Sequence, residues 1–169
     1  MAPVATGRYA GAMQPVHPPI PLPDDRATTR LGQALAARVG AGDTLLLQGG
    51  LGAGKTHLAR ALIQALLPVP EDVPSPSFTL IQTYDGPGFE IWHADLYRLS
   101  GQGDLDELGL DQALGAALCL IEWPDRLAEP PRGALSVQLG IEGAGRRVEL
   151  ASDDPGWTQR LQGLADVPA

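Results

Sequence analysis

The sequence predicts one α/β domain, in which helices flank a mixed central sheet. Its 169 residues suit a single domain, and the 44% of apolar residues can form one packed core. An apolar strand-like segment, a glycine-rich turn and an amphipathic helical pattern follow one another over residues 44–67. Most later segments have the pattern of short strands. This order of elements is typical of an α/β fold whose sheet contains both parallel and antiparallel strands.

The amino-terminal residues predict a tail followed by a helix. Residues 1–23 contain six prolines and show no helical or strand period, so we expect a flexible Pro-rich tail and a domain over residues 24–169. Asp24 or Asp25 can cap the first helix, whose apolar residues recur at helical spacing over residues 27–39.

The remaining elements follow from apolar periodicity and from turn residues. A short apolar run predicts a strand buried on both faces, whereas apolar residues three or four apart predict a helix. Glycines and prolines mark the breaks between these segments. We expect strands over residues 44–48, 78–84, 89–94, 118–121, 135–141 and 147–150, and further helices over residues 57–67 and 104–117.

The overall composition argues against several classes of protein. Twenty Asp and Glu outnumber twelve Lys and Arg, so we expect no strong autonomous binding to nucleic acid, which needs a basic surface. No run approaches the ~18 apolar residues of a membrane span, and no apolar segment of a signal peptide follows Arg8. A single cysteine, Cys119, excludes an intramolecular disulfide framework. We therefore expect a cytoplasmic protein with no membrane contact.

A phosphate-binding motif lies between the first apolar strand and the second helix. Residues 49–56 match the pattern G-x-x-x-x-G-K-[ST], whose glycines let backbone N–H groups face a phosphate at the positive end of a helix. Lys55 is the only lysine among twelve basic residues, as expected where a compact ammonium has to reach the β- and γ-phosphates. The Thr56 hydroxyl can ligate Mg²⁺. The sequence therefore predicts a P-loop NTPase-like domain whose nucleotide contacts Gly50, Leu51, Gly52, Ala53, Gly54, Lys55 and Thr56.

A P-loop also needs a carboxylate at the end of a neighbouring buried strand. Glu122 follows an apolar run, and we expect it to hold the magnesium ion together with Thr56. Asp95 ends the other candidate strand, and we expect it to orient or deprotonate the attacking water. Lys55, Asp95 and Glu122 form the expected catalytic set.

Other residues near these strands are candidates that also have an ordinary structural interpretation. Ser77 and Thr79 lie in a Pro-rich loop that senses the γ-phosphate in P-loop switch proteins, although turn-forming hydroxyls show the same pattern. Trp123 is either a core aromatic residue or a lid that contacts the nucleotide. We interpret His93 as a structural histidine of its strand rather than as a base. No basic residue other than Lys55 is evident for the phosphates.

Five segments, taken in order, resemble the TsaE family of bacterial P-loop ATPases. Members of this family act with TsaB and TsaD in forming threonylcarbamoyladenosine in tRNA. The matching segments are residues 25–32 (DRATTRLG), 51–56 (LGAGKT), 75–80 (SPSFTL), 93–99 (HADLYRL) and 121–124 (IEWP). Because all five occur together, this resemblance is more specific than the P-loop motif alone.

The resemblance implies a Mg²⁺-dependent ATPase with a mixed sheet, which binds ATP and ADP. It implies adenine contact near Thr28, magnesium held through Thr56 and Glu122, and Asp95 as a catalytic carboxylate. It also implies weak hydrolysis by the isolated chain and stimulation by a TsaB–TsaD complex, whose modification cycle the hydrolysis drives or resets. One departure is Ser77, which stands where the family often has threonine.

Two other functions are compatible with a P-loop. A kinase for a small molecule would use Arg126 and Arg132 as lid cations and would transfer phosphate to an acceptor other than water. A GTP-dependent switch of the Ras type is disfavoured, because the chain contains no asparagine for the guanine-reading signature.

Overall fold

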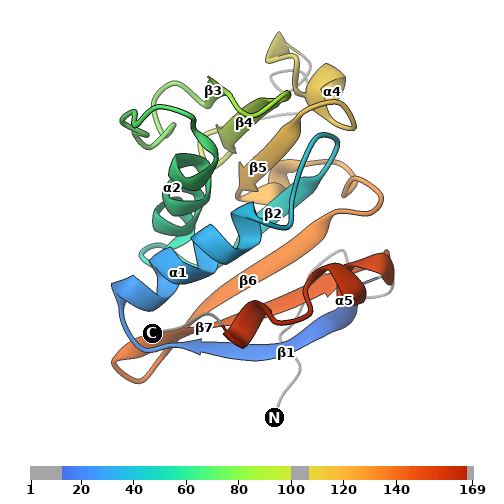
Figure 1. Cartoon of the computed structure of the whole chain (residues 1–169). Helices are drawn as coiled ribbons and strands as arrows, with labels where there is room; N and C mark the ends of the chain where they lie inside the picture. Colours follow the sequence, from blue (N-terminus) through green and yellow to red (C-terminus); the bar gives the residue numbers. More distant parts are fainter. Residues whose placement is uncertain (1–12, 100–106, 167–169) are drawn as a thin grey trace.

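The computed structural model describes residues 13–99 and 107–166. Within these ranges, seven strands form one sheet in the order β1-β7-β6-β2-β5-β4-β3 (Figure 1). The strands are β1 (Gln14–Leu22), β2 (Thr44–Gln48), β3 (Ile81–Asp85), β4 (Glu90–Asp95), β5 (Leu118–Glu122), β6 (Leu135–Glu142) and β7 (Gly145–Ser152). The helices are α1 (Asp25–Ala36), α2 (Lys55–Leu66), α4 (Leu110–Ala113) and α5 (Gly156–Arg160), with 3-10 turns at Pro124–Arg126 and Leu164–Asp166.

The centre of the sheet is parallel and its margins are antiparallel. β4, β5, β2 and β6 run in the same direction, whereas β3, β7 and β1 are each antiparallel to the neighbours with which they pair. This arrangement confirms the predicted mixed sheet. The carboxyl ends of parallel strands meet at one edge, which is where ligands bind in open α/β sheets. Asp95 and Glu122 end β4 and β5 as direct register partners at this edge, and β2 ends there at Gln48.

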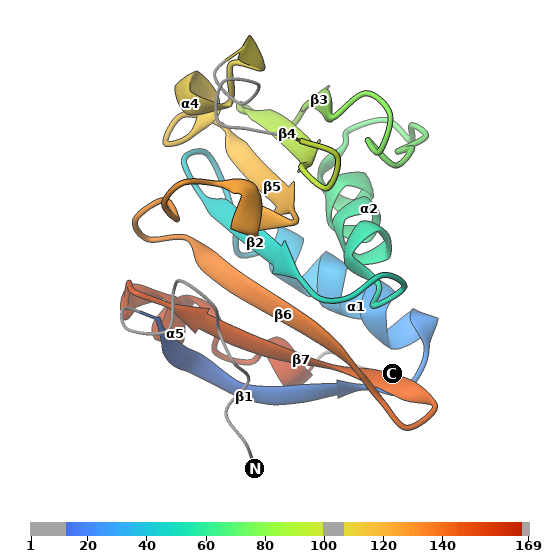
Figure 2. The ribbon, with the colours of Figure 1, turned by 180° about the vertical axis from the view of Figure 1, so that it is seen from behind.

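Apolar side chains cover both faces of the sheet. α1, α2 and α5 lie on one face, where Leu45 and Leu47 of β2 join the same buried cluster (Figures 1 and 2). On the other face, Leu46 of β2 is buried with residues of α4 and of the segment after β5. α1 and α2 approach closely at Gly32, where a Cβ atom would lie 2.7 Å from the Cβ of Ala61. The helix that follows the P-loop is thereby held against both α1 and the sheet.

The amino-terminal strand corrects the expectation of a Pro-rich tail. Gln14–Leu22 pairs antiparallel with β7 at one margin of the sheet, and Val16, Ile20 and Leu22 are buried in the core. Prolines are tolerated there because an edge strand donates hydrogen bonds on one side only. Register shifts along this pairing interrupt the strict alternation that would have marked a strand. The predicted tail is therefore wrong for Gln14–Leu22, and residues 1–12 lie outside the described ranges.

The second half of the chain differs from the prediction in the extent of its helices. The helix expected over residues 104–117 is observed as α4, which lies between two glycines with positive φ, Gly109 (77°) and Gly115 (83°). Residues 100–106, where that helix was expected to begin, lie outside the described ranges. Helix α5 was not predicted. No helix in the described part of the chain is long and apolar enough to cross a membrane.

Candidate nucleotide-binding site

The P-loop connects β2 to α2 through a backbone that requires glycine. Gly49, Gly52 and Gly54 have φ values of 143°, 77° and 102°. Residues with a side chain rarely adopt such φ values. A Cβ atom on Gly49 would also lie 2.5 Å from the carbonyl oxygen of Leu139 in β6. Gly54 is the N-cap of α2 and has no side chain to cap the helix. The first N–H groups of α2 are therefore available to an anion.

Lys55 is buried at the edge of this loop. Its ammonium donates hydrogen bonds to the carbonyl oxygens of Gly49 (2.7 Å) and Gly50 (2.9 Å), and it lies 4.1 Å from the centre of the Trp123 ring. Burial lowers the pKa of Lys55 below its ordinary value of 10.5, although the negative charges of Glu122, Asp95 and Asp125 oppose that shift. The lysine thus lies between loop carbonyls and an aromatic face, close to the two predicted acids.

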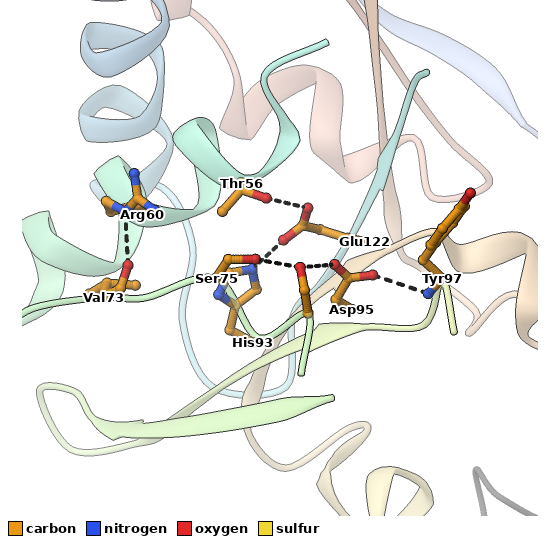
Figure 3. A network of polar contacts seen from close by, with 9 residues as sticks. Thr56, Arg60, Val73, Ser75, His93, Asp95, Tyr97 and Glu122 are labelled. Atoms are coloured by element: carbon orange, nitrogen blue, oxygen red, sulfur yellow. Dashed lines mark hydrogen bonds and ion pairs between the residues drawn. The ribbon is translucent and has the colours of Figure 1, made fainter. Parts of the chain in front are cut away.

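Glu122 joins the P-loop helix to the sheet. One carboxylate oxygen, Oε1, accepts a hydrogen bond from the Thr56 hydroxyl at 2.7 Å. The other, Oε2, lies 2.6 Å from Nε2 of His93 (Figure 3). Glu122 and His93 are both buried, with 2% and 0% exposure. The structure therefore brings together the two residues predicted to hold magnesium, and it adds a histidine that the sequence analysis had treated as structural.

Asp95 lies beside Glu122 and contacts the loop between α2 and β3. Its Oδ2 accepts a hydrogen bond from the Ser77 hydroxyl (3.2 Å), and its Oδ1 accepts one from the backbone N–H of Tyr97 (3.0 Å). The Ser77 hydroxyl is in turn 2.7 Å from the hydroxyl of Ser75. Asp95 is buried, with 7% exposure, and each of its carboxylate oxygens accepts one hydrogen bond from the protein.

A cavity of about 320 Å³ gathers most of the predicted site residues. It is lined by Leu51, Gly52, Gly54, Lys55, Thr56, His57, Ser77, Asp95, Glu122, Trp123 and Arg146. Gly50 and Ala53 belong to the loop but not to this lining: Gly50 contributes the carbonyl bound by Lys55, and Ala53 is buried. Trp123 lines the cavity in the left-handed conformation (φ 58°) and also packs against the buried cluster that contains Leu46, so its contact with a nucleotide stays a prediction.

Two predicted nucleotide contacts lie elsewhere. Thr79 is exposed, and its hydroxyl accepts a hydrogen bond from Gln82 instead of facing the cavity. Thr28 is completely buried in α1 and does not line the cavity. The structure therefore does not bring the side chains of Thr28 and Thr79 to the site, because α1 turns Thr28 into the core and the loop turns Thr79 outward.

Arg146 is a site residue that the sequence analysis missed. Its guanidinium donates to Asp25 (2.9 Å) and to the carbonyl oxygen of Gly52 in the P-loop (3.2 Å). It lines both the cavity described above and a second one of about 420 Å³, formed by the start of α1 and the β6–β7 turn. A pair of arginines after the glycine-rich turn was visible in the sequence, but only the folded chain shows that Arg146, at the start of β7, reaches the P-loop.

The donor atoms of the cavity fit a nucleotide-bound magnesium ion. A hydroxyl and two carboxylates, from Thr56, Glu122 and Asp95, are hard oxygen donors of the kind that Mg²⁺ prefers. The described residues contain no cluster of three or more His, Cys, Asp or Glu that could hold a metal ion by themselves. Magnesium commonly takes only one or two protein carboxylates and completes its octahedron with phosphate oxygens and water. The residues therefore suit a metal that arrives with phosphate.

Comparison with known proteins shows the family to which the chain belongs. The model of the family described as threonylcarbamoyl adenosine biosynthesis protein TsaE matches residues 22–148. The tRNA threonylcarbamoyladenosine biosynthesis protein TsaE of Rickettsia conorii is 40% identical over 134 residues, which cover 78% of this chain and 74% of that protein. The protein of the same name from Treponema pallidum is 34% identical over 122 residues, covering 71% of this chain and 89% of that one.

The fold has a counterpart among solved structures. The crystal structure of Bacillus subtilis YdiB matches with a TM-score of 0.72 and 24% sequence identity, over 88% of this chain and 94% of that chain. At that identity the likeness concerns the fold alone, and it supports the α/β architecture described above. The family match and the relatives lead to one conclusion: this chain belongs to the TsaE family of tRNA threonylcarbamoyladenosine biosynthesis proteins.

Proposed function

We propose that this chain is a Mg²⁺-dependent ATPase that works with TsaB and TsaD in forming threonylcarbamoyladenosine in tRNA. ATP hydrolysis would drive or reset the modification cycle, in the cytoplasm where tRNA is modified. The observation that carries the proposal is the contact between the Thr56 hydroxyl and Glu122 (2.7 Å), which joins the P-loop to an acid at the end of a parallel strand. Lys55 and Asp95 line the same cavity, so the groups needed for phosphate binding and for hydrolysis are in one place.

The P-loop side of the cavity would bind the phosphates. The N–H groups at the start of α2 would face the phosphate oxygens, and the Lys55 ammonium would exchange its two loop carbonyls for β- and γ-phosphate oxygens. Thr56 and Glu122 would hold Mg²⁺, which when bound neutralises the charge that develops on the phosphates. Arg146 lines both cavities. Because the P-loop residues Lys55 and Thr56 line the smaller cavity, that cavity would take the phosphates, and the larger one would take the adenosine.

Asp95 would act on the attacking water. Its Oδ1 and Oδ2 are oriented by Tyr97 N–H and Ser77, and the carboxylate can accept a hydrogen bond, or a proton, from water beside the γ-phosphate. The arginine among the lining residues, Arg146, is bound to Asp25 and to the carbonyl oxygen of Gly52. P-loop enzymes whose cations are not in place at the transition state are slow until a partner supplies or orders a charge. We therefore expect slow hydrolysis by the chain alone.

Phosphate release, measured with and without purified TsaB and TsaD, tests this function. We expect slow ATP hydrolysis by the chain, marked stimulation by the two partners together, and loss of the stimulated rate in an Asp95→Ala variant. Fast hydrolysis that the partners leave unchanged would contradict the proposal. Transfer of the γ-phosphate to a small acceptor other than water would favour the kinase alternative.

A further inference from the structure

His93 lies in β4, and its ring points toward Glu122 at the end of the neighbouring strand β5. It stands two residues before Asp95, so both side chains extend from the same face of the sheet. In the parallel register of β4 and β5, His93 pairs with Leu120, two residues before Glu122. The imidazole of β4 therefore contacts the Glu122 carboxylate from the neighbouring strand, while Thr56 contacts the same carboxylate from α2 (Figure 3).

The polar contacts of the ring lead to Glu122 and to no other described residue. Nε2 lies 2.6 Å from Oε2 of Glu122, and because a carboxylate oxygen accepts hydrogen bonds, we assign the N–H of this contact to Nε2. The other ring nitrogen, Nδ1, is buried and has no hydrogen-bond partner among the described residues. The ring has 0% exposure, and Glu122 is its hydrogen-bond partner among the described residues.

The two oxygens of Glu122 are thus held by two donors from different elements. We propose that His93 is a positioning residue for Glu122, which fixes the carboxylate so that Oε1 faces Thr56 and a magnesium ion bound with the nucleotide phosphates. This inference rests on the proposed function, because it concerns the magnesium that Glu122 would hold. His93 itself is not a catalytic residue, since it is fully buried and its donor nitrogen is occupied by Glu122.

Loss of the His93 donor has a specific consequence. A buried carboxylate oxygen without a donor is unfavourable, so Glu122 would turn toward another partner. Lys55 lines the same cavity and already interacts electrostatically with Glu122. A Glu122–Lys55 pair would withdraw the carboxylate from the metal. The part of nucleotide affinity that depends on Mg²⁺ should therefore fall, whereas the part that does not depend on Mg²⁺ should stay.

The test uses ADP titrated by calorimetry into the full chain, once in excess Mg²⁺ and once in EDTA. The dissociation constant in EDTA divided by the dissociation constant in Mg²⁺ measures how much magnesium strengthens ADP binding. We expect His93→Leu to reduce this ratio about tenfold or more, the usual range for loss of a residue that orients a metal ligand. His93→Gln keeps an N–H donor at similar reach and should retain the ratio within roughly threefold, while His93→Asn has a donor that is too short and should lose it. Ile91→Val, another buried change on the same face of β4, should leave the ratio unchanged.

The outcomes separate the inference from the function on which it rests. If folded His93→Leu and His93→Asn keep the wild-type ratio, or if all His93 variants weaken binding equally in Mg²⁺ and in EDTA, His93 is only structural and the inference is wrong. If His93→Leu fails to fold, the contrast between Gln and Asn decides the question. If the wild-type chain binds no ADP, or binds it equally with and without Mg²⁺, the proposed function fails first and the inference fails with it.

Discussion

The conformation of the P-loop predicts very different effects for alanine at two adjacent glycines. At Gly49, φ is 143°, and an added Cβ would lie 2.5 Å from the carbonyl oxygen of Leu139 and 3.0 Å from the Cβ of Ala53. A non-glycine residue in such a conformation costs about 1–3 kcal/mol. Displacing the backbone of β6 adds a cost of similar size, about 1–3 kcal/mol for an overpacked site. Because the loop can share part of this strain, we expect Gly49→Ala to lower the free energy of unfolding by about 3 kcal/mol.

Gly50 is a matched control in the same loop. A Cβ atom there would have no neighbour within 4 Å, so Gly50→Ala should change the free energy of unfolding by no more than about 0.5 kcal/mol. Thermal unfolding without nucleotide measures both variants, since 1 kcal/mol shifts the Tm of a domain of this size by about 2–4 °C. The expected decrease is about 6–12 °C for Gly49→Ala and below about 2 °C for Gly50→Ala. Equal decreases would refute this account of how the loop is built.

Three further predictions concern the site and the core. Lys55→Arg should weaken ATP binding by roughly tenfold or more without unfolding the protein, because a planar guanidinium does not fit between the loop carbonyls and Trp123. Calorimetry measures the affinity, and a wild-type value in the variant would overturn the role of Lys55. Glu122→Ala should weaken Mg²⁺-dependent nucleotide binding. Asp95→Ala should leave binding largely intact and reduce turnover by ~10²-fold or more. Equal losses of binding in the two variants would contradict separate roles for Glu122 and Asp95. Cys119 is fully buried, and burial raises its pKa to about 12. A disulfide reagent should therefore label the thiol only as the protein unfolds in urea. Rapid labelling of the native protein would contradict the buried position of Cys119.

The parts of the site that are local in sequence could be predicted from it. The P-loop follows from a short run of glycines between an apolar strand and an amphipathic helix, and Glu122 and Asp95 follow from their places at strand ends. These signals lie within single segments, so no knowledge of the sheet order is needed to find them.

The remaining features depend on how distant segments pair. Arg146 reaches the P-loop because β7 begins beside it, and His93 reaches Glu122 because β4 and β5 run parallel in one particular register. Thr28 was placed at the nucleotide by resemblance, but the helical rotation of α1 directs it into the core. Prolines obscured β1, since an edge strand can accommodate residues that a central strand excludes.

Repeated rounds of tRNA modification in a purified system test the central claim most directly. TsaB, TsaD, tRNA and a threonylcarbamoyl donor would be combined with ATP and Mg²⁺. The number of threonylcarbamoyladenosine residues formed per TsaD would be measured in three mixtures: with the wild-type chain, with the Asp95→Ala variant, and with neither protein. We predict that modification continues through many rounds only with the wild-type chain and ATP, because Asp95 is placed to act on the attacking water. Equal modification with Asp95→Ala, or without the chain, would contradict the claim that its ATP hydrolysis drives or resets the cycle.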